Sequence, residues 1–135
     1  MARVLRGLVW VMGGACLPIG VVHLLWGNGS VPGLAGAGPT VDSRERFYGG
    51  LFAGYGAAWL WVAAQRPIPA RPVRWLTAVF WLGGMGRLLS LGVAGRPQSF
   101  QLLLTGIEVA LPPVLLGLAS ADETDPDATL ERSSY

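Results

Sequence analysis

The stretch VRWLTAVFWLGGMGRLLSLGVAGRPQSFQLLLTGIEVALPPVLLGLA, residues 73–119, decides the fold class. It contains two apolar runs, 73–94 and 100–119, which are separated by a short turn with Gly95 and Pro97. Each run is long enough to cross a hydrocarbon core of about 30 Å as an α-helix, whereas barrel strands need only about 9–11 residues of alternating polarity. The stretch therefore predicts two transmembrane helices that form an antiparallel hairpin.

Two further apolar runs, 4–26 and 47–64, precede this hairpin. Hydrophobic residues make up 52% of the chain and charged residues only 13%, which is too little charge for the surface of a soluble domain. The first run is too long for a signal-peptide core and no cleavage site follows it, so we expect a retained helix. The sequence predicts an all-α, integral membrane four-helix bundle with antiparallel up-down topology over residues 1–120. An acidic, disordered cytoplasmic tail is expected over residues 121–135.

The arginines predict the orientation of these helices. All ten basic residues are Arg, and one side of the predicted bundle carries five of them: Arg3, Arg6, Arg66, Arg71 and Arg74. The other side has fewer, and Asp42 and Glu45 offset two of those. Because cytoplasmic segments carry the excess of basic residues, we expect a multi-pass protein of the cell membrane with both termini in the cytoplasm. The arginines form no continuous stripe, so no nucleic-acid partner is predicted.

Two ionisable residues, Arg87 and Glu108, lie inside predicted spans. They are nearly symmetric about the turn at residues 97–98, which places both roughly 10–15 Å below the outer surface. An isolated Arg at the centre of a spanning helix costs about 2.5–3.5 kcal/mol on insertion scales. We therefore predict an Arg87–Glu108 pair, which either fixes the register of the two helices or belongs to a ligand site.

Other polar residues fall in the same outer half of the predicted bundle. His23 lies near the end of the first run, and Asp42 and Ser43 are positioned to cap the second helix. These residues are predicted to converge in depth on one leaflet, although a single sequence does not fix their rotation. The candidate ligand-binding residues are His23, Asp42, Arg46, Tyr55, Arg87, Ser90 and Glu108.

The motifs of common enzymes and cofactor sites are missing from the sequence. We find no nucleophile triad, phosphate loop, dinucleotide fingerprint or haem motif. The single His23 has no Cys or carboxylate at metal-ligand spacing, so neither a metal nor a cofactor is predicted. No residue is assigned a catalytic role, and the sequence does not support an enzyme.

Small residues predict how the helices meet. The second run contains nested small-xxx-small pairs, which let backbones approach closely in lipid: Gly49, Gly50, Ala53, Gly54, Ala57 and Ala58. Packing inside the bundle is the first interpretation of this face, and self-association of two chains is the alternative.

Several of these motifs resemble one bacterial family, catalogued as domain of unknown function 4345. The similar motifs are His23 before Gly27, DSxxRFYGG at residues 42–50 with GYG at 54–56, GGxxRLLS at 83–90 with GxP at 95–97, and IE with PP over 107–113. The resemblance covers roughly residues 5–119. It implies a four-helix protein of the bacterial inner membrane and supplies no activity.

Three hypotheses about function follow from the sequence. The first is a binding or accessory module, whose polar pocket in the outer half of the bundle holds a lipid, quinone or similar amphiphile. The second is a small proton-coupled transporter that acts as a dimer, although Arg87 would keep Glu108 ionised and unsuited to proton exchange. The third is a structural subunit of a larger membrane complex, in which the Arg87–Glu108 pair only fixes helix register. The expected partners are membrane lipids, a larger membrane complex or a second copy of the chain.

Overall fold

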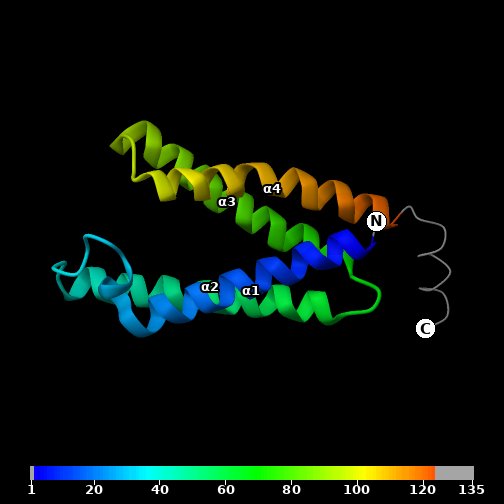
Figure 1. Cartoon of the computed structure of the whole chain (residues 1–135), viewed down its shortest axis with the longest axis horizontal. Coiled ribbons are helices and arrows are strands. Elements are labelled where there is room, and N and C mark those ends of the chain that lie inside the picture. Colours follow the sequence, from blue (N-terminus) through cyan, green and yellow to red (C-terminus); the bar gives the residue numbers. More distant parts are fainter. Residues whose placement is uncertain (1, 124–135) are drawn as a thin grey trace. The chain divides into compact units, whose positions relative to one another are not determined.

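The computed structural model describes residues 2–123, and these are helical apart from short connections (Figure 1). The elements in chain order are α1 (Ala2–Trp26), the short 3-10 helix η1 (Gly27–Ser30), α2 (Pro39–Ala64), α3 (Ala70–Ala94) and α4 (Ser99–Glu123). No strand occurs among the described residues. The predicted all-α class and the four long helices are confirmed.

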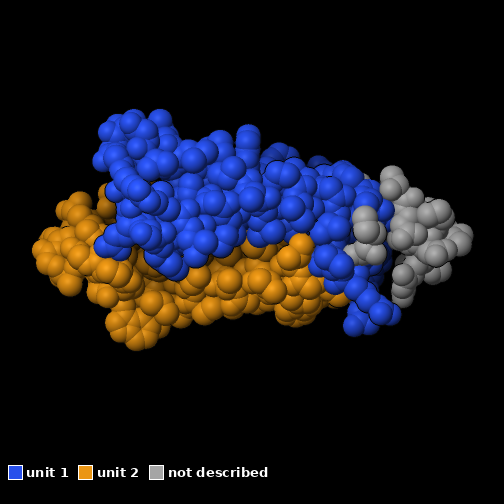
Figure 2. Space-filling model, turned by 45° about the horizontal axis from the view of Figure 1, so that its top comes forward, with its two compact units in different colours: residues 1–5, 66–135 blue, residues 6–65 orange. Residues whose placement is uncertain are grey.

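The chain divides into two compact units, each built around a helical hairpin (Figure 2). The first hairpin, residues 6–65, contains η1, α2 and all of α1 beyond its first residues. The second hairpin contains α3 and α4, in a unit that combines residues 1–5 and 66–135. Each hairpin is described below by itself.

Two helix boundaries differ from the prediction by four residues or more. The second helix begins at Pro39 instead of residue 47, because Gly38 is its N-cap and a proline at the first helical position needs no hydrogen-bond donor. The prediction that Asp42 and Ser43 cap this helix is therefore wrong. The fourth helix continues to Glu123 instead of ending near residue 119. The remainder of the predicted tail lies outside the described residues.

In the first hairpin the backbones of α1 and α2 are in direct contact. An added Cβ at Gly20, Gly49 or Gly56 would overlap backbone atoms of the facing helix. Such close approach gives helices in lipid the packing contacts that hold them together. Part of the predicted small-residue face serves this contact, since Gly49 lies against α1 and Ala53 meets Gly20, whereas Gly54 has nothing within 4 Å.

In the second hairpin α3 and α4 are in close contact at Gly84. An added Cβ there would lie 3.1 Å from both the Cβ and the carbonyl oxygen of Glu108. Pro112 and Pro113 lie inside α4 and lack N–H groups, so the carbonyls of Glu108 and Val109 lose their usual partners four residues on. The contact at Gly84 therefore lies beside the Glu108 side chain and beside a backbone carbonyl that has no intrahelical hydrogen-bond donor.

Three helical segments are long and apolar enough to cross a membrane: Ala2–Ser30, Ala70–Ala94 and Ser99–Asp122. Large apolar side chains are exposed along them, for example Leu82 at 71% and Val93 at 81%, as expected of surfaces that face lipid. The α2 helix is not among these segments, because glycines and aromatic residues with polar atoms lower the apolar character of residues 47–64.

Candidate functional site

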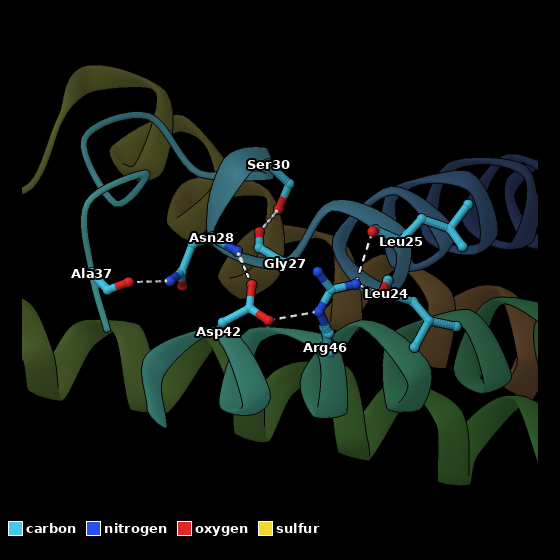
Figure 3. A network of polar contacts seen from close by, with 8 residues as sticks. All are labelled: Leu24, Leu25, Gly27, Asn28, Ser30, Ala37, Asp42 and Arg46. Atoms are coloured by element: carbon cyan, nitrogen blue, oxygen red, sulfur yellow. Dashed lines mark hydrogen bonds and ion pairs between the residues drawn. The ribbon is translucent and has the colours of Figure 1, made fainter. Parts of the chain in front are cut away.

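A network of polar contacts closes the first hairpin where α1 leads into η1 (Figure 3). Asp42 Oδ1 accepts a hydrogen bond from the backbone N–H of Asn28 at 3.1 Å, and Asp42 Oδ2 accepts one from Arg46 Nε at 2.7 Å. Arg46 Nη1 donates to the carbonyl oxygens of Leu24 and Leu25 at 3.0 and 2.8 Å. These carbonyls lie in the last turn of α1, where no intrahelical donor remains, so Arg46 of α2 caps α1.

The same network holds the loop before α2. Asn28 Nδ2 donates to the carbonyl of Ala37 at 2.7 Å. Gly27 has φ +50° and an added Cβ would overlap the Asp42 carboxylate, so this position requires glycine. The hydrogen bond from Arg46, followed by that from the Asn28 backbone, lowers the pKa of Asp42 from its ordinary 3.8. These contacts stabilise the charged form of Asp42 at neutral pH.

His23 belongs to a second group of contacts at this end of the hairpin. Ser30 Oγ lies 2.9 Å from His23 Nδ1 and donates its own proton to the Gly27 carbonyl at 2.6 Å. Because a hydroxyl has one proton, neutral His23 must carry its hydrogen on Nδ1, which leaves Nε2 as the acceptor. Glu45 Oε2 also approaches Nδ1, at 3.9 Å. In a hydrolase triad the serine and the acid lie on opposite ring nitrogens, so this arrangement is not a triad.

The second hairpin carries a separate group, Arg87, Gln101 and Glu108, which we call the α3–α4 cluster. Arg87 Nε lies 2.7 Å from Glu108 Oε2, and Arg87 Nη1 donates a short hydrogen bond to Gln101 Oε1. Oε2 is buried and accepts no aligned hydrogen bond, so the contact with Nε is an ion pair of bent geometry. The predicted Arg87–Glu108 pair is confirmed.

The sequence of α4 directs its polar side chains toward one face. Gln101, Thr105 and Glu108 are spaced by four and three residues, which aligns them along a helix. Thr105 is buried, and its hydroxyl donates a hydrogen bond to the carbonyl oxygen of Gln101 at 2.8 Å. Gly84 of α3 lies against Glu108, and Arg87 follows Gly84 by almost one turn. Because the helices are in close contact at Gly84, the Arg87 guanidinium reaches both Gln101 and Glu108, which lie at the two ends of this polar face.

The structure sorts the predicted site residues into separate groups. His23, Asp42 and Arg46 lie together at the η1 end of the first hairpin. Tyr55 lies on α2 about 14 Å along the helix from Arg46, between the rings of Phe52 and Trp59 at 6.1 and 6.0 Å. On the second hairpin, Arg87 and Glu108 pair, and Ser90 is exposed on α3.

Sequence reasoning missed two residues that hold these groups together. Gln101 is not among the predicted site residues, although its spacing from Glu108 places both on one helix face. Asn28 was read only as part of a Gly-rich loop, and nothing in its neighbours indicates that it contacts both Asp42 and Ala37.

The fold and these groups define a class: a small all-α protein of two hairpins, with three helices suited to a membrane and an ion pair inside one of the hairpins. Within residues 2–123 no group of three or more His, Cys, Asp or Glu side chains is placed to hold a metal ion. The chain belongs to the family described as domain of unknown function (DUF4345), which matches residues 4–119. No curated protein and no solved structure was found to match it.

Proposed function

We propose that this protein is a binding module of the bacterial inner membrane, in which the α3–α4 cluster holds the polar end of an amphiphile such as a lipid or quinone. One observation carries the proposal. Arg87 is paired with Glu108, yet its side chain remains 38% exposed while that of Glu108 is only 12% exposed. A partly exposed guanidinium is within reach of a ligand, and charged residues inside membrane segments commonly mark substrate or ion pathways.

The surroundings of Arg87 support an amphiphilic ligand. The two helices that carry the cluster also carry exposed apolar side chains, among them Leu89 at 69% and Leu103 at 61%. An amphiphile would lay its chain over such a surface and present its polar end to the guanidinium. This combination of an apolar lining and a few placed polar groups is typical of small-molecule sites.

The proposal includes four membrane spans with both termini in the cytoplasm. In the first hairpin the α1–α2 backbone contacts extend from Gly20 and Gly49 to Gly56, so a membrane that contains α1 also contains the middle of α2. The orientation rests on the arginines at positions 3, 6, 66, 71 and 74. In this orientation the cluster lies in the outer half of the bilayer.

Two other functions are less well supported. A proton-coupled transporter needs a carboxyl group that is free to take up and release a proton, whereas the Glu108 carboxylate is held by Arg87 Nε at 2.7 Å. A structural subunit needs the ion pair only for helix register. In that case the exchanged pair, Arg87→Glu with Glu108→Arg, would restore the folding and stability of the protein, whereas a ligand site at the cluster would not survive the exchange.

Native mass spectrometry of protein purified in mild detergent tests the proposal. We expect the wild type to retain an amphiphile and the double variant Arg87→Leu/Glu108→Leu to lose it. The double variant leaves no unpaired charge in the membrane, so its circular dichroism should stay helical. Arg44→Leu, at an exposed position in the first hairpin, is the matched control. A double variant that still retains the amphiphile would contradict the proposal.

A further inference from the structure

The orientation of the Gln101 amide follows from its partner. An arginine has only hydrogen-bond donors, so Gln101 must turn its oxygen toward Arg87, as the structure shows for Oε1. The amide nitrogen Nε2, with its two hydrogens, is therefore directed away from the guanidinium. No acceptor for Nε2 is found in the part of the chain that the structure describes.

Arg87 has spare donors of the same kind. Its Nε faces Glu108 and its Nη1 faces Gln101, whereas Nη2 contacts no acceptor among residues 2–123. Arg87 Nη2 and Gln101 Nε2 are thus two donor groups on side chains that are joined by a hydrogen bond between their other polar atoms. The hydrogen bond holds both side chains and Glu108 also holds Arg87, so a ligand would not have to order them.

The charge of the cluster selects among possible ligands. The positive charge of Arg87 and the negative charge of Glu108 cancel, so the pair is neutral. An anionic ligand would add a net negative charge close to the Glu108 carboxylate, in a medium where charges are poorly screened. A neutral carbonyl oxygen accepts hydrogen bonds from the same donors without adding charge.

The depth of the donors fits a carbonyl group as well. Arg87 lies seven residues before the end of α3 at Ala94, and Gln101 lies two residues after the start of α4 at Ser99. At 1.5 Å per residue these positions are about 10 Å and about 3 Å inside the turn between the helices. In the proposed membrane orientation these two depths correspond to the region below the charged headgroups, beside the start of the acyl chains.

We propose that Arg87 Nη2 and Gln101 Nε2 form a two-donor site for a neutral amphiphile whose polar end carries carbonyl oxygens, and that Glu108 excludes anionic amphiphiles. This inference rests on the proposed function and narrows it to one ligand chemistry. Carbonyl oxygens of this kind occur in the esters of neutral glycerolipids and in quinones.

Three probes that each carry one ten-carbon chain test the inference on the full chain in detergent: monodecanoylglycerol, decyl-benzoquinone and decyl phosphate. Their binding is measured by native mass spectrometry at pH 7.5. We expect the wild type to bind one neutral probe at least about tenfold more tightly than decyl phosphate, because the repulsion between the phosphate and the Glu108 carboxylate is poorly screened at this site. The neutral probe that binds more tightly identifies an ester or a quinone as the source of the carbonyl.

Two variants test the roles of the side chains. Glu108→Gln gives the cluster a net positive charge, and we expect it to reverse the preference in favour of decyl phosphate. Gln101→Met removes the second donor without adding charge, and should weaken the neutral probe about tenfold. Glu45→Gln and Gln98→Met repeat these changes outside the cluster and should alter neither value. Circular dichroism and melting in detergent verify that each variant is folded.

The outcomes separate this inference from the proposed function. A wild type that binds decyl phosphate most tightly, or a Glu108→Gln variant with unchanged preference, overturns the two-donor site while the binding module stands. A wild type that binds none of the probes and retains no amphiphile on purification overturns both.

Discussion

The two hairpins of this protein are held together in different ways. In the first, backbones touch at several glycines, and an arginine at each end caps the partner helix. Arg6 of α1 donates to the carbonyls of Ala63 and Gln65, both at 3.0 Å, and Arg46 of α2 donates to the last carbonyls of α1. In the second, one glycine contact at Gly84 is combined with an ion pair away from the helix ends.

This difference separates structural polar groups from candidate functional ones. The arginines of the first hairpin donate hydrogen bonds to carbonyls that every helix end leaves without donors. The presence of these arginines is therefore explained without a ligand. Arg87 and Glu108 satisfy no helix end and lie inside segments suited to a membrane, where charged side chains are rare and commonly functional. The first hairpin is therefore the scaffold, and the second carries the candidate site.

The largest effect is expected from a bulky residue at a glycine of the first hairpin. Gly56→Leu would force α1 and α2 apart, because even an added Cβ overlaps the backbone at Leu17. We expect a destabilisation of at least about 3 kcal/mol, or no folded protein, in thermal unfolding followed by circular dichroism in detergent. Gly54→Leu is the matched control, since its Cβ would have nothing within 4 Å. Equal stability of the two variants would show that the glycine contact does not hold this hairpin.

Breaking the ion pair of the second hairpin should have the next largest effect. Arg87→Leu leaves the Glu108 carboxylate without its cation, which costs about 3–5 kcal/mol at a fully buried pair. We expect about 2–3 kcal/mol in the unfolding assay, because the Arg87 side chain is 38% exposed. The double variant Arg87→Leu/Glu108→Leu should recover most of this loss. If the double variant is as unstable as the single one, the penalty does not come from the unpaired carboxylate.

The sequence predicted the second hairpin better than the first. The depth of Arg87 and Glu108 follows from counting residues away from a clear turn, and a charge in lipid needs a partner at matching depth. Such counting fixes depth but not rotation, so it could not show that Gly84 faces Glu108 or that Gln101 completes the cluster.

The first hairpin was predicted less well, because its polar contacts follow no periodic pattern in the sequence. Residues 39–46 are polar, so the hydrophobic pattern placed the start of α2 too late, although Gly38 and Pro39 are a recognisable start signal. Asp42 was assigned to a helix cap, which is its commonest role. In the structure the Asp42 carboxylate instead accepts a hydrogen bond from Asn28 across the loop. This is possible because Gly27 adopts a positive φ and has no Cβ, which would overlap the carboxylate.

A smaller effect is expected when the cap on α1 is removed. Arg46→Met loses the hydrogen bonds to the carbonyls of Leu24 and Leu25, which water can partly replace because Arg46 is 44% exposed. We expect a loss of about 1 kcal/mol in the unfolding assay. Arg44→Met, which removes only an exposed contact at 3.7 Å to Glu45, should change stability by less than about 0.5 kcal/mol. Equal effects at both positions would mean that Arg46 does not act as a cap.

The smallest effect concerns the pH dependence of the loop of the first hairpin. Hydrogen bonds from Arg46 and from the Asn28 backbone place the folded pKa of Asp42 below the ordinary 3.8. The unfolded state therefore binds the proton more readily, so the stabilisation by Asp42 is fully present above about pH 4 and is lost as the pH falls through the folded pKa. Hydrogen exchange of the Asn28 amide, measured between pH 2.5 and 6 and corrected for intrinsic rates, should show protection that disappears at the acid end. In Asp42→Asn the protection should be low and independent of pH over the same interval, because the amide side chain does not titrate. Protection that falls with acid equally in both proteins would assign the pH dependence to another group.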